Sequence, residues 1–154
     1  MPRALMFGIV LLLCSGCERK PATEGLFLSI EANLKSLRQV PGRFQATPQS
    51  EESPFTAYFQ QSNLQMVDEQ PQDGSSLRRR YYFHEGGLFY YRELENNQLQ
   101  RQFVIDKDGK VKNAIPGGFP GADLGRIEAR AAALKDAAIS RAGQMFVFPL
   151  MRNR

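Results

Sequence analysis

The chain has 154 residues, 42% of them hydrophobic, and its 20 lysine and arginine residues against 16 acidic ones give a net charge of +4. This length fits one domain with a real hydrophobic core. The charge excess is too small to indicate a nucleic-acid-binding protein, which usually carries a strongly basic face.

The first residues have the pattern of a secretory signal. Arg3 precedes an apolar run from Ala4 to Leu13, which is about half of the roughly twenty residues that a helix needs to cross a bilayer. A basic start, a short apolar middle and small residues at the cut are typical of a cleavable signal peptide. The run therefore predicts export and not a permanent membrane span.

Ser15, Gly16 and Cys17 resemble the lipobox of bacterial lipoproteins, although Cys14 stands where that motif usually carries leucine. The resemblance implies that residues 1–16 are cut away and that Cys17 is acylated, anchoring the chain in the bacterial cell envelope, facing the periplasm. Glu18 is not the aspartate that marks inner-membrane retention, so the outer membrane is the expected location. The alternative is an ordinary secreted protein that is cut nearby.

Lipidation at Cys17 limits the available chemistry. Cleavage removes Cys14 and Arg3, leaving 138 residues, a net charge of +3 and no free thiol. His84 is the only histidine, whereas zinc sites built from histidine and cysteine use three or four such ligands. We therefore predict no metal and no cofactor, with a lipidated tether at residues 17–23 and one domain at residues 24–154.

Two helices are expected before the first strand. Thr23 can cap a helix from Glu24 to about Gln39, whose apolar residues recur every three or four positions. Pro41 and Gly42 are expected to end it. A polar loop then leads to Ser53 and Pro54, a pair typical of the start of a second, short helix.

Five strand-like runs follow, each separated by residues that favour tight turns. They are Leu64–Glu69, Arg78–His84, Leu88–Leu94, Leu99–Ile105 and Lys110–Ile115. Turns this short cannot hold parallel crossovers, so the runs predict an antiparallel meander.

Asp123 is expected to cap a last helix that ends near Ala142 and Gly143. The apolar run Met145–Leu150 that follows has the length of a strand, which is expected to lie at an edge of the sheet, where it could also serve as a docking edge. The order of elements indicates an α+β fold. We predict an antiparallel β-meander of about four to five strands, with an N-terminal and a C-terminal helix packed on one face.

The alternation of side chains along strands separates a predicted core face from an opposite face that is rich in rings. Tyr82, Phe89 and Tyr91 lie on the opposite face, where exposed rings could bind a sugar, a peptide or a protein. The alternative is that a helix covers them. Arg78, Arg79 and Arg80 fit a solvated edge strand, in which Arg79 should face away from the other two. Arg78 and Arg80 complete the candidate binding face, to which an anionic ligand could also bind.

No pattern indicates a catalytic residue. His84 and Glu85 should point to opposite faces of a strand, and Asp106 and Asp108 fit a hairpin turn better than an acid/base pair. The Gly-x-Ser-x-Gly motif of one hydrolase class is absent, and the glycines at 117–121 lack the lysine and serine or threonine of a phosphate-binding loop.

These observations favour a lipid-anchored, non-enzymatic protein-binding module of the envelope, such as an assembly factor, an inhibitor or an immunity protein. Its expected partners are the membrane, through Cys17, and an envelope protein, with no nucleic acid. Peptidoglycan or glycan binding through the ring-rich face is the alternative, and a hydrolase of unknown type is the third choice.

Overall fold

A computed structural model describes residues 22–70, 76–115 and 121–151. The predicted signal peptide, Cys17 and most of the tether lie outside these residues. The described elements, in chain order, are α1 (Ala22–Asn33), the 3₁₀ helix η1 (Leu34–Ser36), β1 (Arg38–Phe44), β2 (Ser53–Gln60), β3 (Asn63–Glu69), β4 (Leu77–His84), β5 (Gly87–Glu95), β6 (Gln98–Ile105), β7 (Val111–Ile115) and α2 (Gly121–Met151).

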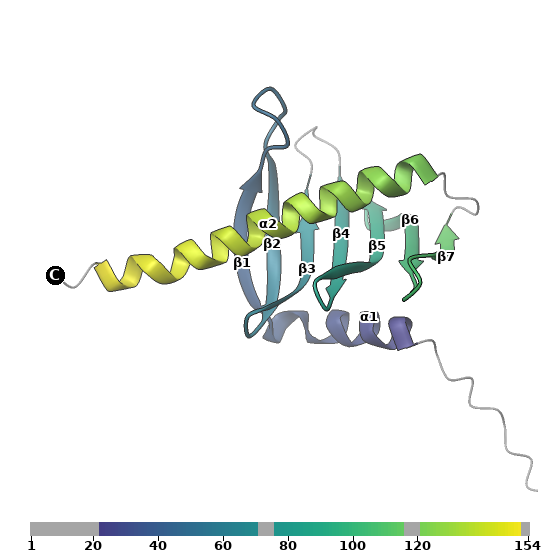
Figure 1. The fold of residues 1–154 in the computed structure, drawn as a ribbon, viewed down its shortest axis with the longest axis horizontal. Helices are drawn as coiled ribbons and strands as arrows, with labels where there is room; N and C mark the ends of the chain where they lie inside the picture. Colours follow the sequence, from purple (N-terminus) through teal and green to yellow (C-terminus); the bar gives the residue numbers. More distant parts are fainter. Residues whose placement is uncertain (1–21, 71–75, 116–120, 152–154) are drawn as a thin grey trace, which may run out of the picture.

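All seven strands form one sheet in the order of the chain, and every neighbouring pair is antiparallel. The α+β class and the antiparallel meander are confirmed (Figure 1). The predicted number of four to five strands is wrong, because two strands precede the five that the turns indicated. β1 and β7 form the two outer edges of the sheet.

The two additional strands occupy segments that were predicted as helix and loop. β1 contains Pro41 and Gly42, and proline is tolerated on an edge strand where its nitrogen faces away from the neighbouring strand. In β2, Ser53 and Pro54 begin a strand and not a helix, and burial alternates along it with the period of two that a strand shows. The predicted first helix therefore ends at Asn33, and the second does not form.

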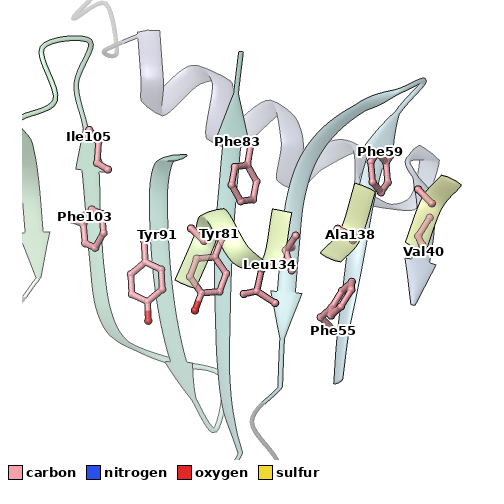
Figure 2. Close-up of a cluster of buried hydrophobic side chains, with 14 residues drawn as sticks. Val40, Phe55, Phe59, Tyr81, Phe83, Tyr91, Phe103, Ile105, Leu134 and Ala138 are labelled. Atoms are coloured by element: carbon pink, nitrogen blue, oxygen red, sulfur yellow. The ribbon is translucent and has the colours of Figure 1, made fainter. Parts of the chain in front are cut away.

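The two helices cover opposite faces of the sheet, which corrects the prediction that both pack on one face. Phe27 and Ile30 of α1 pack in a cluster with Tyr82 and Tyr90. Leu134 and three alanines of α2 pack on the other face, over a row of side chains from β1 to β6 (Figure 2). The members of this larger cluster are Val40, Phe55, Ala57, Phe59, Val67, Tyr81, Phe83, Tyr91, Phe103, Ile105, Ala131, Leu134, Ala138 and Ala142.

The helix α2 is longer than the sequence predicted. It does not end near Gly143 but continues to Met151, so the predicted strand at Met145–Leu150 is helical. Its 31 residues give a length of about 46 Å at the usual rise per residue. The helix crosses the sheet diagonally and its C-terminal turns extend past β1 (Figure 1).

A β-bulge changes which residues of β5 share a face. Tyr82 pairs with Tyr90, whereas the next residue, Phe83, pairs with Leu88, so Phe89 is the extra residue of β5. A bulge of this kind shifts the alternation by one position. Tyr91 consequently pairs with Tyr81 and lies on the α2 face, whereas Tyr90 lies on the α1 face.

Candidate functional site

The predicted ring-rich binding face is not a surface of the folded domain. Tyr82, Phe89 and Tyr91 have exposed fractions of 0%, 7% and 1%. Tyr82 and Phe89 are covered by α1, and Tyr91 is covered on the opposite face by α2. The alternative that helices cover these rings is the one that the structure shows, so the three rings do not form one exposed binding face.

The three consecutive arginines lie in β4, the central strand of the sheet, and not in a solvated edge strand as predicted. The predicted alternation is confirmed. Arg78 and Arg80 both bind Asp68 on one side of the sheet, and Arg79 binds Glu93 on the other. Each arginine therefore has a carboxylate partner within the sheet.

On the α1 side, the charged groups connect the helix to the sheet. Arg80 lies 3.2 Å from both Asp68 and Glu31 of α1, and the Tyr82 hydroxyl donates a hydrogen bond to Glu31. Burial raises the pKa of Tyr82 well above its usual value, and the negative charge of Glu31 raises it further. The phenol therefore stays protonated and acts as a donor to Glu31.

On the α2 side, Glu69 is fully buried and receives bonds from two elements. The Tyr81 hydroxyl donates to it at 3.0 Å, and Arg130 of α2 forms an ion pair with it. The Arg130 side chain also donates to Ser53 at 3.2 Å and stacks over Phe44, 4.6 Å from the ring centroid. Arg130 thereby fixes the helix to β1, β2 and β3 by polar as well as aromatic contacts.

A second tyrosine repeats this arrangement beside Arg79. The Tyr91 hydroxyl donates to Glu93 at 2.9 Å, and Arg79 lies 3.3 Å from the same carboxylate. The Tyr81 and Tyr91 hydroxyls point toward the same end of the strands (Figure 2). Burial is the main cause that raises the pKa of both phenols, and Glu69 and Glu93 add to it.

These groups form the floor of a hollow of about 350 Å³ between α2 and the sheet, here called the arginine hollow. Arg101 of β6 lies 3.9 Å from Asp123 at the start of α2, and Arg126 also binds Asp123. Sequence reasoning placed Arg79 on the face opposite to Arg78 and Arg80 but did not include it in the candidate binding face. It also missed the other arginines of the hollow, which lie more than twenty residues further along the chain. The lining residues are Arg79, Tyr81, Tyr91, Glu93, Arg101, Asp123, Arg126, Ile127 and Arg130.

A second hollow, of about 640 Å³, lies where α2 passes over the outer edge of β1. We call it the β1 groove; it is lined by Pro41, Gly42, Arg43, Ala137, Ser140, Arg141 and Gln144. Just beyond it, the Met145 side chain is 46% exposed.

The exposure of Met145 follows from the position of the sheet edge. At 3.6 residues per turn, Met145 continues the stripe of Leu134, Ala138 and Ala142, which is buried against the sheet. In the part of the chain that the structure describes, β1 is the last strand under this stripe, so these strands do not reach as far as Met145.

The remaining sequence candidates lie in turns. The His84 Nε2 atom lies 3.8 Å from the Glu85 Oε1 atom, so the prediction that the two side chains point to opposite faces is wrong. The reason is that Glu85 has a positive φ of 51° in the β4–β5 turn. Asp106 forms the predicted hairpin turn, accepting backbone hydrogen bonds from Asp108 and Lys110. Its ion pair with Lys112 and these bonds lower the pKa of Asp106 to about 2.

Within residues 22–70, 76–115 and 121–151, no group of three or more histidine, cysteine, aspartate or glutamate side chains is arranged to hold a metal ion. No helix among these residues is both long and apolar enough to cross a membrane. The glycine-containing segment predicted as a connector lies mostly outside them.

Comparisons with known proteins gave no match: no family model, no curated protein and no solved structure is significantly similar to this chain.

Proposed function

We propose that the chain is a membrane-anchored bacterial envelope lipoprotein whose folded domain is a non-enzymatic protein-binding module, of the assembly-factor, inhibitor or immunity type. The attachment rests on the sequence pattern that ends at Cys17. The binding function rests on one structural observation: Met145 continues the buried stripe of α2 but is 46% exposed, since no strand of the described residues lies beyond β1 to cover it.

An extended segment of a partner protein could fill this position as an additional strand. A strand paired to the outer edge of β1 would lie about 4.8 Å beyond it, under the overhanging turns of α2 (Figure 1). Its backbone would bond to β1, and alternate side chains would enter the β1 groove, as in other complexes that extend a sheet. Such a strand would cover Met145.

Pro41 limits this pairing without preventing it. If its nitrogen faces outward, as prolines in edge strands do, the outer edge lacks one donor while the bonds to β2 are kept. The backbone N–H groups of Gln39 and Arg43, two residues away on either side, would then also point outward, because bonded and non-bonded positions alternate along an antiparallel pair. The added strand would therefore bond to β1 on both sides of Pro41.

The charges of the groove favour a partner segment with a carboxylate. Arg43 and Arg141 line it, and the Arg43 side chain is 68% exposed although it binds Glu52 at 3.1 Å. A second copy of this chain would bring the same arginines to the groove and increase the positive charge. An acidic segment of another envelope protein would lower it.

Site-specific photocrosslinking in the envelope tests this proposal. A photoreactive phenylalanine derivative replaces Met145 in the full chain, and the matched control carries it at Ile139, which is 51% exposed but lies roughly 120° away around α2. We expect an adduct with one envelope protein from position 145 and not from position 139. Gln39→Pro, which removes a second outward donor, should abolish the adduct.

Equal adducts at both positions, or an adduct that survives Gln39→Pro, would contradict binding at the β1 edge. An adduct of twice the mass of the chain would identify a second copy as the occupant, contrary to the proposed module. Sedimentation with insoluble peptidoglycan tests the glycan alternative, and we expect the protein to stay in the supernatant.

The lipid anchor is tested separately. Blocking the lipoprotein signal peptidase with globomycin should cause the precursor to accumulate, and Cys17→Ser should release the protein from the membrane fraction. If neither occurs, the chain is not a lipoprotein, whatever its domain binds.

A further inference from the structure

We propose that the arginine hollow binds a phosphate group carried by a small molecule. This site lies on the sheet face beneath α2, away from the β1 groove, and is independent of the proposed protein-binding function. Four arginines from β4, β6 and α2 surround it.

The charges in and beneath the hollow do not balance. Among the described residues, the four guanidinium groups of Arg79, Arg101, Arg126 and Arg130 form ion pairs with three carboxylates, those of Glu69, Glu93 and Asp123. The start of α2 adds the partial positive charge of a helix N-terminus. The site consequently has an excess of positive charge that a bound anion would neutralise.

The arginines retain hydrogen-bonding capacity beyond their bonds to these carboxylates. A guanidinium group has five N–H donors. Arg79 binds its carboxylate through Nε, and Arg126 through one Nη. Arg130 uses one Nη for both of its bonds, so its other Nη makes neither of them, whereas its Nε is buried and cannot reach a group bound in the hollow.

The arrangement suits a tetrahedral anion better than a planar one. Guanidinium groups approach from two strands and from the helix, so oxygen atoms that point in several directions could each meet a donor. A carboxylate, with two oxygen atoms in one plane, would leave part of the set unused. The volume of about 350 Å³ lies at the lower end of the range for small-molecule pockets and leaves room for a small substituent on the phosphate.

The floor of the hollow is fixed, which favours binding without rearrangement. The Tyr81 and Tyr91 hydroxyls donate to Glu69 and Glu93 and so hold these carboxylates in place. Their rings are buried in the α2-side cluster. Arg126, with a side chain that is 81% exposed, lies at the opening and could close over a bound group.

Titration of the full chain with three probes at constant ionic strength tests the proposal. The probes are inorganic phosphate, glycerol 3-phosphate and acetate, with binding followed by calorimetry and by the ring resonances of Tyr81 and Tyr91. We expect saturable binding of both phosphate compounds. Tighter binding of glycerol 3-phosphate would identify a lipid headgroup as the source, and equal binding would identify free phosphate.

Single substitutions locate the bound group. Arg101→Gln and Arg126→Gln each remove one charged guanidinium from an exposed side chain and should weaken phosphate binding at least about tenfold. Lys107→Gln, which removes an exposed charge in the turn between β6 and β7, is the matched control and should leave the affinity unchanged. The proposal is overturned if phosphate does not saturate, if acetate binds equally well, or if Lys107→Gln weakens binding as much as the other two.

Discussion

Gly42 in β1 offers a sharp test of how the sheet packs at its outer edge. The glycine pairs with Phe55 of β2, and a Cβ atom built on it would lie 2.3, 2.8 and 2.9 Å from three atoms of the Phe55 ring. The ring is 4% exposed and packs in the α2-side cluster, so it has no free space to move into. Gly42→Ala should therefore force a shift of the ring or of β1.

The expected cost is that of overpacking a core, about 1 to 3 kcal/mol of unfolding free energy. The measurement is urea unfolding followed by circular dichroism. Gly143→Ala is the matched control: a Cβ there meets nothing within 4 Å, and replacing an exposed glycine inside a helix should stabilise the protein by about 0.5 to 1 kcal/mol.

A double-mutant cycle separates the clash from other effects of the methyl group. Phe55→Ala alone removes a large buried side chain and should cost about 3 to 5 kcal/mol. On that background the ring is absent, so Gly42→Ala should cost almost nothing more. If Gly42→Ala is harmless in the wild-type chain, or equally harmful without the ring, the ring does not lie over Gly42.

Two further predictions concern the buried polar groups. Arg130→Met leaves the fully buried Glu69 without its cation and should lower the free energy of unfolding in urea by about 3 kcal/mol. Arg126→Met removes an exposed ion pair and should lower it by less than about 1 kcal/mol. Equal losses of unfolding free energy would contradict a structural role for the Arg130 pair. All five tyrosines have a raised pKa, with burial the largest cause, so their contribution to stability is complete below the unfolded value of about 10 and is lost as the pH rises above it. Phenolate absorbance at 295 nm should therefore appear together with the loss of circular dichroism, and titration of Tyr81, Tyr82 and Tyr91 near pH 10 in the folded protein would refute this reasoning.

The strands that sequence reasoning found are those bounded by turn-forming residues. From β3 to β7, every predicted run coincides with a strand to within one residue at either end, since glycine, asparagine and aspartate mark the tight turns between them. β1 and β2 were missed because Pro41 with Gly42 and Ser53 with Pro54 match helix-end and helix-start patterns equally well. Their long-range pairing overrides these local signals.

The arginine hollow and the β1 groove could not be predicted in the same way. Arg79 and Arg101 are brought together by the pairing of β4, β5 and β6, which the turns do indicate. The positions of Arg126 and Arg130 depend instead on which face α2 covers and at what angle it crosses the sheet. The exposure of Met145 depends on how far α2 continues past β1. No local pattern in the sequence specifies these quantities.

The central strands also explain why the binding face was misassigned. β4 has an arginine and a tyrosine on each face, since Arg79 and Arg80 are followed by Tyr81 and Tyr82. A sheet that is covered on both sides needs large, partly apolar side chains on both faces, so the alternation of polar and apolar residues that marks a one-sided sheet disappears. Rings on such a strand indicate two buried faces and not an exposed one. Surfaces available for binding are then expected at the edges of the sheet and along the margins of the covering helices, which is where the β1 groove and the arginine hollow lie.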